Sequence, residues 1–339
     1  MYIELLNKTI TSYPLEETMN FDIEKHTILE VIHGSHAYGT NTPDSDIDLR
    51  GVAVPPKRFF IGFSNIFEQN IVGQHGSKED TTIYDIRKFF RLTTDSNPNM
   101  IELLFVPDRC IKKITPWGEK ILANRELFLS QKAKFKFSGF AMSQLKRMKT
   151  HRGWLLDPPD HKPTREEFDL GANPVLSVNV RDAIDSLVRA HINLTSVIKD
   201  SAIVAYQQEK KFHDAMRVWD HYQKWRSERN PARAILEAKY GYDTKDAMHL
   251  VRVMRMAKEI LTTGKVLVER PDAEELVAIK NGAWKYEEIM AWADNHDSEL
   301  NAMYDDPTQN SVLPHSPDVN TLDALCVEIV EDFLTTHKG

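Results

Sequence analysis

Cysteines, long apolar runs and an excess of positive charge are all missing from this 339-residue sequence. The two cysteines, Cys110 and Cys326, lie far apart and form no CxxC pair, which argues against a zinc site and predicts a reducing, cytoplasmic compartment. No run of about 18 apolar residues occurs, so we expect no membrane span. The start, MYIELLNKTITSYPLEE, lacks the basic and apolar regions of a signal peptide. The net charge of -7 excludes a uniformly basic surface for nucleic acid.

One segment departs from this acidic balance. Residues 127–156 contain no Asp or Glu, and this +7 window predicts a local anion-binding face. The alternative is a solvated helix face whose charges are balanced by acidic neighbours in space. Lys146, Arg147 and Lys149 are the residues that we expect to contact an acceptor. The seven basic residues of the window are Lys132, Lys134, Lys136, Lys146, Arg147, Lys149 and Arg152.

The pattern of the chain changes near residue 120. Before it, residues 27–32, 47–54 and 81–84 have the composition of strands, and a helix over 86–94 follows Asp85. After it, apolar residues recur at helical spacing. We therefore predict an α+β fold with a small mixed sheet in a first domain, 1–120, and a mostly helical second domain, 121–339. The predicted helices cover 127–152 (as one helix or two), 179–208, 213–229, 232–240, 246–263, 272–280, 286–304 and 322–335, with a loop over 306–317.

The stretch VIHGSHAYGTNTPDSDIDLRGV, residues 31–52, carries the chemistry. A strand leads into Gly34 and Ser35, where a small residue lets backbone N–H groups approach a phosphate, and the residues after this turn should open a helix. Asp46 and Asp48 follow at the start of a second strand, on one face, with Ile47 buried behind them. Two adjacent carboxylates repel each other unless a cation neutralises them, and oxygen ligands select Mg²⁺ or Mn²⁺. The pattern predicts a metal site beside a phosphate-binding turn.

This segment resembles the DNA polymerase beta-like nucleotidyltransferase superfamily, whose motif is Gly-Ser, a short helix and then Asp-x-Asp. The segments DTTIYDIRKFFRL, NPNMIELLF, YGYDTKDAMHLVRVMRMAKEILTTG and RPDAEELVAIKNGAW extend the similarity to the polymerase-beta family associated with RNA ligases and RNA repair, over residues 34–284. The resemblance implies a nucleotidyltransferase domain followed by a helical region. It leaves the acceptor undefined.

The superfamily generally uses a third carboxylate from a later strand. Asp80 and Asp85, on either side of TTIY, are the two main candidates, and Glu79 is a minor one. Alternation places Asp80 on one strand face with Thr82, whereas Asp85 points the other way and stands where a helix N-cap belongs. We therefore predict that Asp80 joins Asp46 and Asp48 as the third catalytic, metal-binding carboxylate.

Other polar residues are candidates for binding the triphosphate or the acceptor. Arg50 lies two positions beyond Asp48, and Lys88 lies on the helix after the third strand; either could bind phosphate or form an ion pair. Lys245, His249 and Arg252 line one helical face at i, i+4 and i+7, which a solvated polar stripe would also do. Glu102 fits a structural salt bridge better than a ligand contact. His33, His36 and His151 lack the spaced partners of a metal site.

Four functions remain open at this point. The enzyme could transfer a nucleoside monophosphate from an NTP, for which we expect ATP, to an RNA end, to a small molecule or to a protein hydroxyl, or the chain could be a non-catalytic nucleotide-binding module. The intact Gly34, Ser35, Asp46 and Asp48 argue against the last. The basic window favours RNA over a small cationic acceptor, and no feature of the sequence separates RNA from protein acceptors. Nothing in the sequence indicates the oligomeric state.

Overall fold

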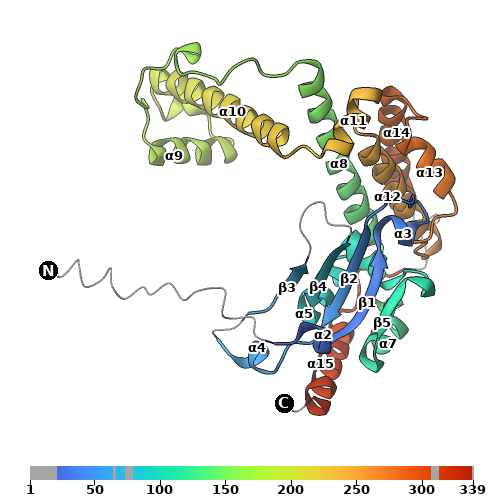
Figure 1. The fold of residues 1–339 in the computed structure, drawn as a ribbon. Helices are drawn as coiled ribbons and strands as arrows, with labels where there is room; N and C mark the ends of the chain where they lie inside the picture. The colour runs from blue at the N-terminus through green and yellow to red at the C-terminus, as the bar shows by residue number, and fades with distance from the viewer. Residues whose placement is uncertain (1–20, 64–65, 73–78, 307–312, 338–339) are drawn as a thin grey trace. The chain divides into compact units, whose positions relative to one another are not determined.

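The computed structural model describes residues 21–63, 66–72, 79–306 and 313–337 (Figure 1). The start of the chain, for which the sequence predicted no signal peptide, and residues 307–312 of the loop predicted over 306–317 lie outside these residues. Within the described part of the chain, no helix is both long enough and apolar enough to cross a membrane.

The chain forms two compact units. Met1–Lys146 and Thr244–Gly339 make up the first, and Arg147–Asp243 makes up the second. This division differs from the predicted boundary after residue 120, because the helices after residue 243 return to the unit that holds the sheet. The predicted α+β fold, with a small mixed sheet near the N-terminus and helices beyond it, is confirmed.

The first unit is built on a five-stranded sheet in the order β3-β4-β2-β1-β5 (Figure 1). β2 and β4 run parallel, and the other neighbouring pairs run antiparallel. Because β1 and β2 lie next to each other near the middle, the residues at the end of β1 and the start of β2 come together. The strands are β1 (Thr27–His33), β2 (Ile47–Ala53), β3 (Gln69–Val72), β4 (Glu79–Asp85) and β5 (Ile111–Ile114).

Side-chain caps define several helices around this sheet. Asp85 accepts a hydrogen bond from the Arg87 N–H at the start of α5, and Asn97 accepts one from Asn99 at the start of α6. α5, α6 and α7 pack against strands of the sheet, and α15 packs against α5 and α7. The helices of this part are α2 (Ile23–His26), α3 (Gly34–Tyr38), α4 (Arg58–Ile61), α5 (Ile86–Thr94), α6 (Pro98–Leu104), α7 (Pro116–Ala123) and α15 (Val319–Thr336), with 3-10 turns η1 (Asp108–Cys110) and η2 (Arg125–Phe128).

Three further helices complete the first unit. α12 (Thr244–Thr263) packs against α13 (Ala273–Lys280) and α14 (Tyr286–Asp305). Most of α12 is buried, which is why it carries apolar residues on nearly every side. A hydrogen bond from the Arg270 N–H to the Tyr38 carbonyl ties the segment between α12 and α13 to the end of α3.

The second unit contains the C-terminal half of α8 (Lys132–Leu156), the 3-10 turns η3 (Glu166–Phe168) and η4 (Leu194–Ser196), and the helices α9 (Val178–Arg189), α10 (Asp200–Glu228) and α11 (Pro231–Tyr240). The predicted helix over 179–208 is wrong as one element. His191 adopts a positive φ of 55°, and the Asn193 side chain accepts a hydrogen bond from the Thr195 N–H, so the chain turns there. α10 then covers both the end of that prediction and the predicted helix over 213–229.

Candidate functional site

The Gly34 turn joins β1 to α3 in the first unit. Gly34 has a positive φ of 66°, which side chains rarely allow. A Cβ placed on Gly34 would lie 2.2 Å from Oδ2 of Asp48, so any other residue would require the Asp48 carboxylate to move. The turn that the sequence predicted to bind phosphate therefore lies directly beside Asp48, a carboxylate of β2.

Ser35 follows on α3 with its hydroxyl uncommitted. Its carbonyl accepts hydrogen bonds from the N–H groups of Gly39 and Thr40. Its side chain has no hydrogen-bond partner among the residues that the structure describes. The hydroxyl can therefore donate to a ligand that enters beside Asp48.

Asp48 and Asp80 are direct neighbours in the register of the parallel strands β2 and β4. Their side chains are 35% and 46% exposed. The Arg50 guanidinium lies 3.6 Å from one oxygen of Asp48 and 3.4 Å from one oxygen of Asp80. Arg50 thus supplies the cation that two adjacent carboxylates require.

The strand edge at Asp46 and Ile47 differs in part from the prediction. Asp46 lies in the loop just before β2 and is exposed. Ile47 is 38% exposed, so the expectation that it is buried is wrong. His33, the last residue of β1, pairs with Asp48. Ile47, one residue earlier in β2, therefore lies beyond the end of β1.

The donor set at this edge fits a divalent cation in part. Mg²⁺ is commonly held by one or two carboxylates, with water and substrate phosphates completing its six ligands. Asp48 and Asp80 match that pattern, and Gly34, which has no side chain, lies against Asp48. Across the described residues, however, no three His, Cys, Asp or Glu side chains gather into a group that could hold a metal. Metal binding by Asp46 stays a prediction.

Asp85 has the capping environment that the sequence indicated. Its carboxylate is buried, accepts from the Arg87 N–H at 2.7 Å and forms an ion pair with the Arg87 guanidinium at 2.7 Å. These bonds commit both carboxylate oxygens to the start of α5. Asp85 is therefore the structural member of the pair, and Asp80 is the one that lies beside Asp48.

This difference gives a paired prediction. Asp80→Asn should lower nucleotidyl transfer at least about 10²-fold with little change in melting temperature, since its half-exposed ion pair contributes at most about 1 kcal/mol. Asp85→Ala should destabilise the protein by about 0.5–2 kcal/mol or more through the lost cap. Initial rates and thermal melts of both variants check this, and the reverse pattern would show that the roles are exchanged.

A buried polar cluster lies behind the Gly34 turn. Glu102 on α6 is fully buried, accepts from the Tyr38 hydroxyl at 2.5 Å and forms an ion pair with Arg252 of α12 at 2.6 Å. The Arg252 guanidinium also lies 3.7 Å from the centre of the Tyr38 ring. His33 Nε2 lies 3.6 Å from Glu102, and burial lowers the pKa of this histidine, so it is neutral near pH 7. The cluster fixes both ends of the β1–α3 turn.

This cluster bears on two of the open interpretations, those of Glu102 and Arg252. Glu102 forms the structural salt bridge that the sequence favoured. Arg252, predicted to bind nucleotide, is 4% exposed and is directed at Glu102. Its position favours a structural role, and nucleotide contact by Arg252 remains untested. Tyr38 was missed, although it lies within the motif segment, because a buried tyrosine has no spacing signal of its own.

The other predicted ligand residues occupy varied environments. Lys88 forms an ion pair with Glu68 at 2.9 Å, so it is held at the sheet edge. Lys245 is exposed at the start of α12 and His249 is half-buried one turn later. His36 Nε2 lies 3.4 Å from the Ser45 carbonyl and helps to fold the loop before β2. Nucleotide binding by Lys88, Lys245 and His249 stays a prediction.

The basic window separates into two parts along α8. In the first part, Lys132 and Lys136 both pair with Asp95, at 2.6 and 2.5 Å. Lys134 is buried and donates to Asn301 at 2.5 Å. Asp95 therefore offsets part of the charge of this segment, as the alternative interpretation expected, whereas the Asn301 amide is neutral. In the second part, the side chains of Lys146, Arg147 and Lys149 are exposed, and His151 stacks on Trp154.

Comparisons with known proteins give a family match and one curated relative. Residues 12–156 match the RNA repair pathway DNA polymerase beta family, which confirms the resemblance over that part of the chain. The similarity seen in the segments beyond residue 156 lies outside this match. An uncharacterised 38.9 kDa protein in the nrdC–mobD intergenic region of Enterobacteria phage T4 is 32% identical over 94 residues. That alignment covers 26% of this chain and 28% of the phage protein. No solved structure matches.

Proposed function

We propose, from the match of residues 12–156 to the RNA repair pathway DNA polymerase beta family, that this protein transfers a nucleoside monophosphate from an NTP to a hydroxyl at an RNA end. The observation that carries the proposal is the register of Asp48 and Asp80 beside the Gly34–Ser35 turn. In the reaction, the acceptor oxygen bonds to the α-phosphorus of the NTP, the bond to the β-phosphate oxygen breaks, and pyrophosphate leaves. The hydroxyl proton is released to solvent.

Asp48 and Asp80 would hold the divalent cation, with Asp46 as the third predicted ligand. Bound there, Mg²⁺ or Mn²⁺ would neutralise charge on the triphosphate and on the attacking oxygen. The carboxylates are kept in place by β2 and β4, whose paired backbones fix their separation. Ser35 would donate its hydroxyl hydrogen to a phosphate oxygen, because no described residue uses that hydrogen.

Arg50 has two roles in this proposal. Without substrate, its guanidinium neutralises Asp48 and Asp80, which lowers the repulsion between them. A divalent cation held by Asp48 and Asp80 would supply the same neutralisation, and the Arg50 guanidinium would then be placed to donate to a phosphate oxygen of the NTP, a role that Arg suits well. Arg50 is thus a phosphate ligand that the carboxylate pair keeps at the site.

For the acceptor, the exposed part of the basic window on α8 supports RNA. Phosphates are the expected partners of clustered Lys and Arg side chains, and counterion release drives their binding. Since only a short segment is basic in a chain of net charge -7, we expect few phosphates to be engaged. Three or four single-strand contacts would give a log–log salt dependence of about -2 to -3.

The triple variant Lys146→Ala, Arg147→Ala and Lys149→Ala tests this acceptor. RNA binding should weaken about tenfold or more while NTP binding is unchanged, because three charges leave one exposed helix segment. Titration of a labelled single-stranded RNA at several salt concentrations measures both the affinity and the slope. The slope should become shallower by about 0.7 for each contact that is lost.

A matched control removes three exposed lysines of the first unit that lie outside the window, by Lys57→Ala, Lys112→Ala and Lys265→Ala. It should bind RNA as the unaltered protein does. Equal RNA binding by both triple variants, or no RNA binding at low salt, would exclude this surface.

The activity itself is tested with the four NTPs, each labelled at the α-phosphate, with Mg²⁺ or Mn²⁺ and either total RNA or lysate. Label that enters RNA supports the proposal, with ATP as the expected donor. Label that enters protein or a small molecule would replace the RNA acceptor by one of those classes. No label in any fraction, with NTP still bound, would indicate a binding module.

A further inference from the structure

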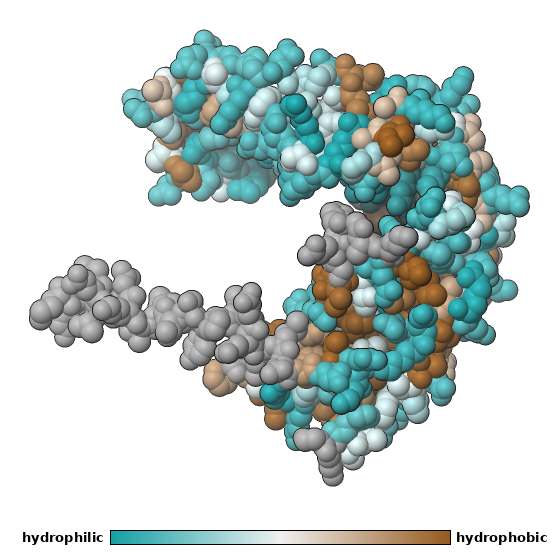
Figure 2. Space-filling view, in the orientation of Figure 1, coloured by the Kyte–Doolittle hydropathy of each residue, from teal (hydrophilic) through white to brown (hydrophobic). Residues whose placement is uncertain are grey.

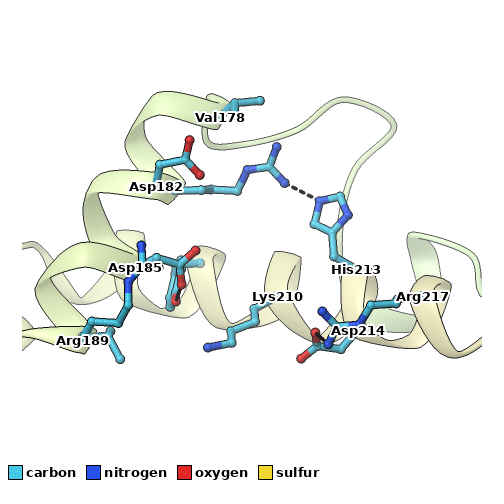
Figure 3. A pocket seen from close by; sticks show the side chains of 11 residues that line it. Val178, Asp182, Asp185, Arg189, Lys210, His213, Asp214 and Arg217 are labelled. Carbon is cyan, nitrogen blue, oxygen red and sulfur yellow. Dashed lines mark hydrogen bonds and ion pairs between the residues drawn. The ribbon is translucent and has the colours of Figure 1, made fainter. Parts of the chain in front are cut away.

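The second unit contains a cavity of about 610 Å³ between α9 and α10 (Figure 3). Charged side chains from both helices line it, and the face of α9 and α10 seen in Figure 2 is mostly hydrophilic. The volume lies within the range of small-molecule sites. The cavity is built entirely from residues of the second unit, so none of the proposed catalytic residues contributes to it.

Most of the carboxylates here are already bound. Asp185 accepts a hydrogen bond from the Tyr206 hydroxyl, and Asp214 pairs with Arg217 at 2.8 Å. Glu209, fully buried on the same face of α10 as His213, is paired with Arg165 at 2.6 Å. Asp182 is the lining carboxylate for which the described residues supply no bond.

Apart from Arg217, the lining cations form no ion pair with a described carboxylate. Arg189 and Lys210 form no hydrogen bond or ion pair with any described residue, and Lys210 lies 5.7 Å from the centre of the Tyr206 ring. Arg181 donates to Nε2 of His213, which must be unprotonated to accept (Figure 3). The Arg181 Nε–H is buried without any partner. Arg181, Arg189 and Lys210 thus face two carboxylates without an ion pair, Asp182 and Asp185, so the lining keeps one excess positive charge. The unsatisfied Arg181 Nε–H costs stability unless a ligand supplies an acceptor.

We propose that this cavity binds the phosphate of a nucleotide, either a free mononucleotide or the phosphorylated end of an RNA strand. Arg181, Arg189 and Lys210 supply the donors for an anion with several oxygens. Val178 and Val188, 58% and 39% exposed at the wall, offer apolar surface to a ribose or base. Asp182 can accept a hydrogen bond from a ribose hydroxyl or an exocyclic amine. The site does not depend on the transferase activity proposed for the first unit.

The test uses the full chain without divalent cations at low salt. Its probes are AMP, a 5′-phosphorylated oligoribonucleotide and the same oligoribonucleotide without the phosphate. The double variant Arg189→Gln and Lys210→Gln should bind the phosphorylated probes about tenfold more weakly. The control variant Lys211→Gln and Lys224→Gln removes two exposed charges from α10 outside the cavity and should bind as the unaltered protein does. Thermal melts confirm that both variants fold.

The two sources of phosphate give different results. Weaker binding of AMP identifies a free nucleotide, and weaker binding of the phosphorylated oligoribonucleotide alone identifies an RNA end. The proposal is overturned if the cavity variant and the control variant bind the probes with equal affinity. It is also overturned if the protein binds the oligoribonucleotide equally well with and without its phosphate and the cavity variant binds AMP as the unaltered protein does. The proposed transferase activity is tested independently of this cavity. Asp48→Asn should lower nucleotidyl transfer but leave the affinity of the cavity for the phosphorylated probes unchanged.

Discussion

Asp48→Asn should lower nucleotidyl transfer by at least about 10²-fold and leave the fold intact. Asp48 stands at the meeting point of the Gly34 turn, the Asp80 strand and the Arg50 guanidinium. Asparagine keeps the shape of the side chain but removes the negative charge that would hold a divalent cation. The loss therefore falls on transition-state stabilisation, while the packing against Gly34 is retained.

Stability should change little in this variant. The Asp48 side chain is 35% exposed, and its contact with Arg50 is long at 3.6 Å, so the ion pair is worth at most about 1 kcal/mol. Removing one of two neighbouring carboxylates also relieves their repulsion. Initial rates of labelled nucleotide incorporation and thermal melts measure the two effects.

Asp44→Asn provides the control for Asp48→Asn. Asp44 is exposed in the loop before β2, so Asp44→Asn removes one negative charge a few residues away from Asp48. It should retain nearly full activity. Near-full activity of Asp48→Asn, or an equal loss of activity in both variants, would contradict the assignment of Asp48 as a metal-binding carboxylate.

Glu102→Ala should destabilise the protein by about 3–5 kcal/mol. Glu102 is fully buried and Arg252 is 4% exposed, so removing the carboxylate leaves a guanidinium charge buried without its partner. The Tyr38 hydroxyl loses its acceptor in the same step. Chemical denaturation measures the loss, and activity should fall with it because Tyr38 holds α3 beside the site.

A double variant separates charge from volume in this cluster. Glu102→Leu with Arg252→Leu removes both charges and keeps apolar bulk, so it should be more stable than Glu102→Ala. The Tyr38 hydroxyl would remain unsatisfied, which limits the recovery by about 1–3 kcal/mol. A double variant no more stable than Glu102→Ala would mean that the lost packing, and not the unpaired charge, causes the destabilisation.

The local pattern of the sequence predicted the elements with strong signals. The strands of 27–32 and 47–54, the helix over 86–94 with its Asp85 cap and the helices after residue 230 agree closely with the structure. The short strands β3 and β5 were not predicted, because four residues carry too little periodicity to identify a strand. The break between α9 and α10 was also missed, since apolar residues on both sides of Asn193 keep the helical spacing.

The candidate site shows the same division. Spacing along the chain was enough to select Gly34, Ser35, Asp46 and Asp48, and strand alternation was enough to prefer Asp80 over Asp85. Alternation fails at Ile47, because burial depends on whether a neighbouring strand extends that far. It also cannot show that Arg50 reaches both carboxylates, since this contact requires the parallel register of β2 and β4.

By itself, the sequence determined the fold class, the candidate Gly-Ser and Asp-x-Asp motif and the capping role of Asp85, because each depends on residues close together in the chain. Only the tertiary structure decided which charges are committed. Arg252 is separated from Glu102 by 150 residues, and Asp95, the C-cap of α5, pairs with both Lys132 and Lys136 of α8, so no local pattern could reveal these pairs. The C-terminal helices belong to the same unit as the sheet, although the second unit precedes them in the chain. This arrangement buries most of α12, including Arg252, and it cannot be read from the order of the elements.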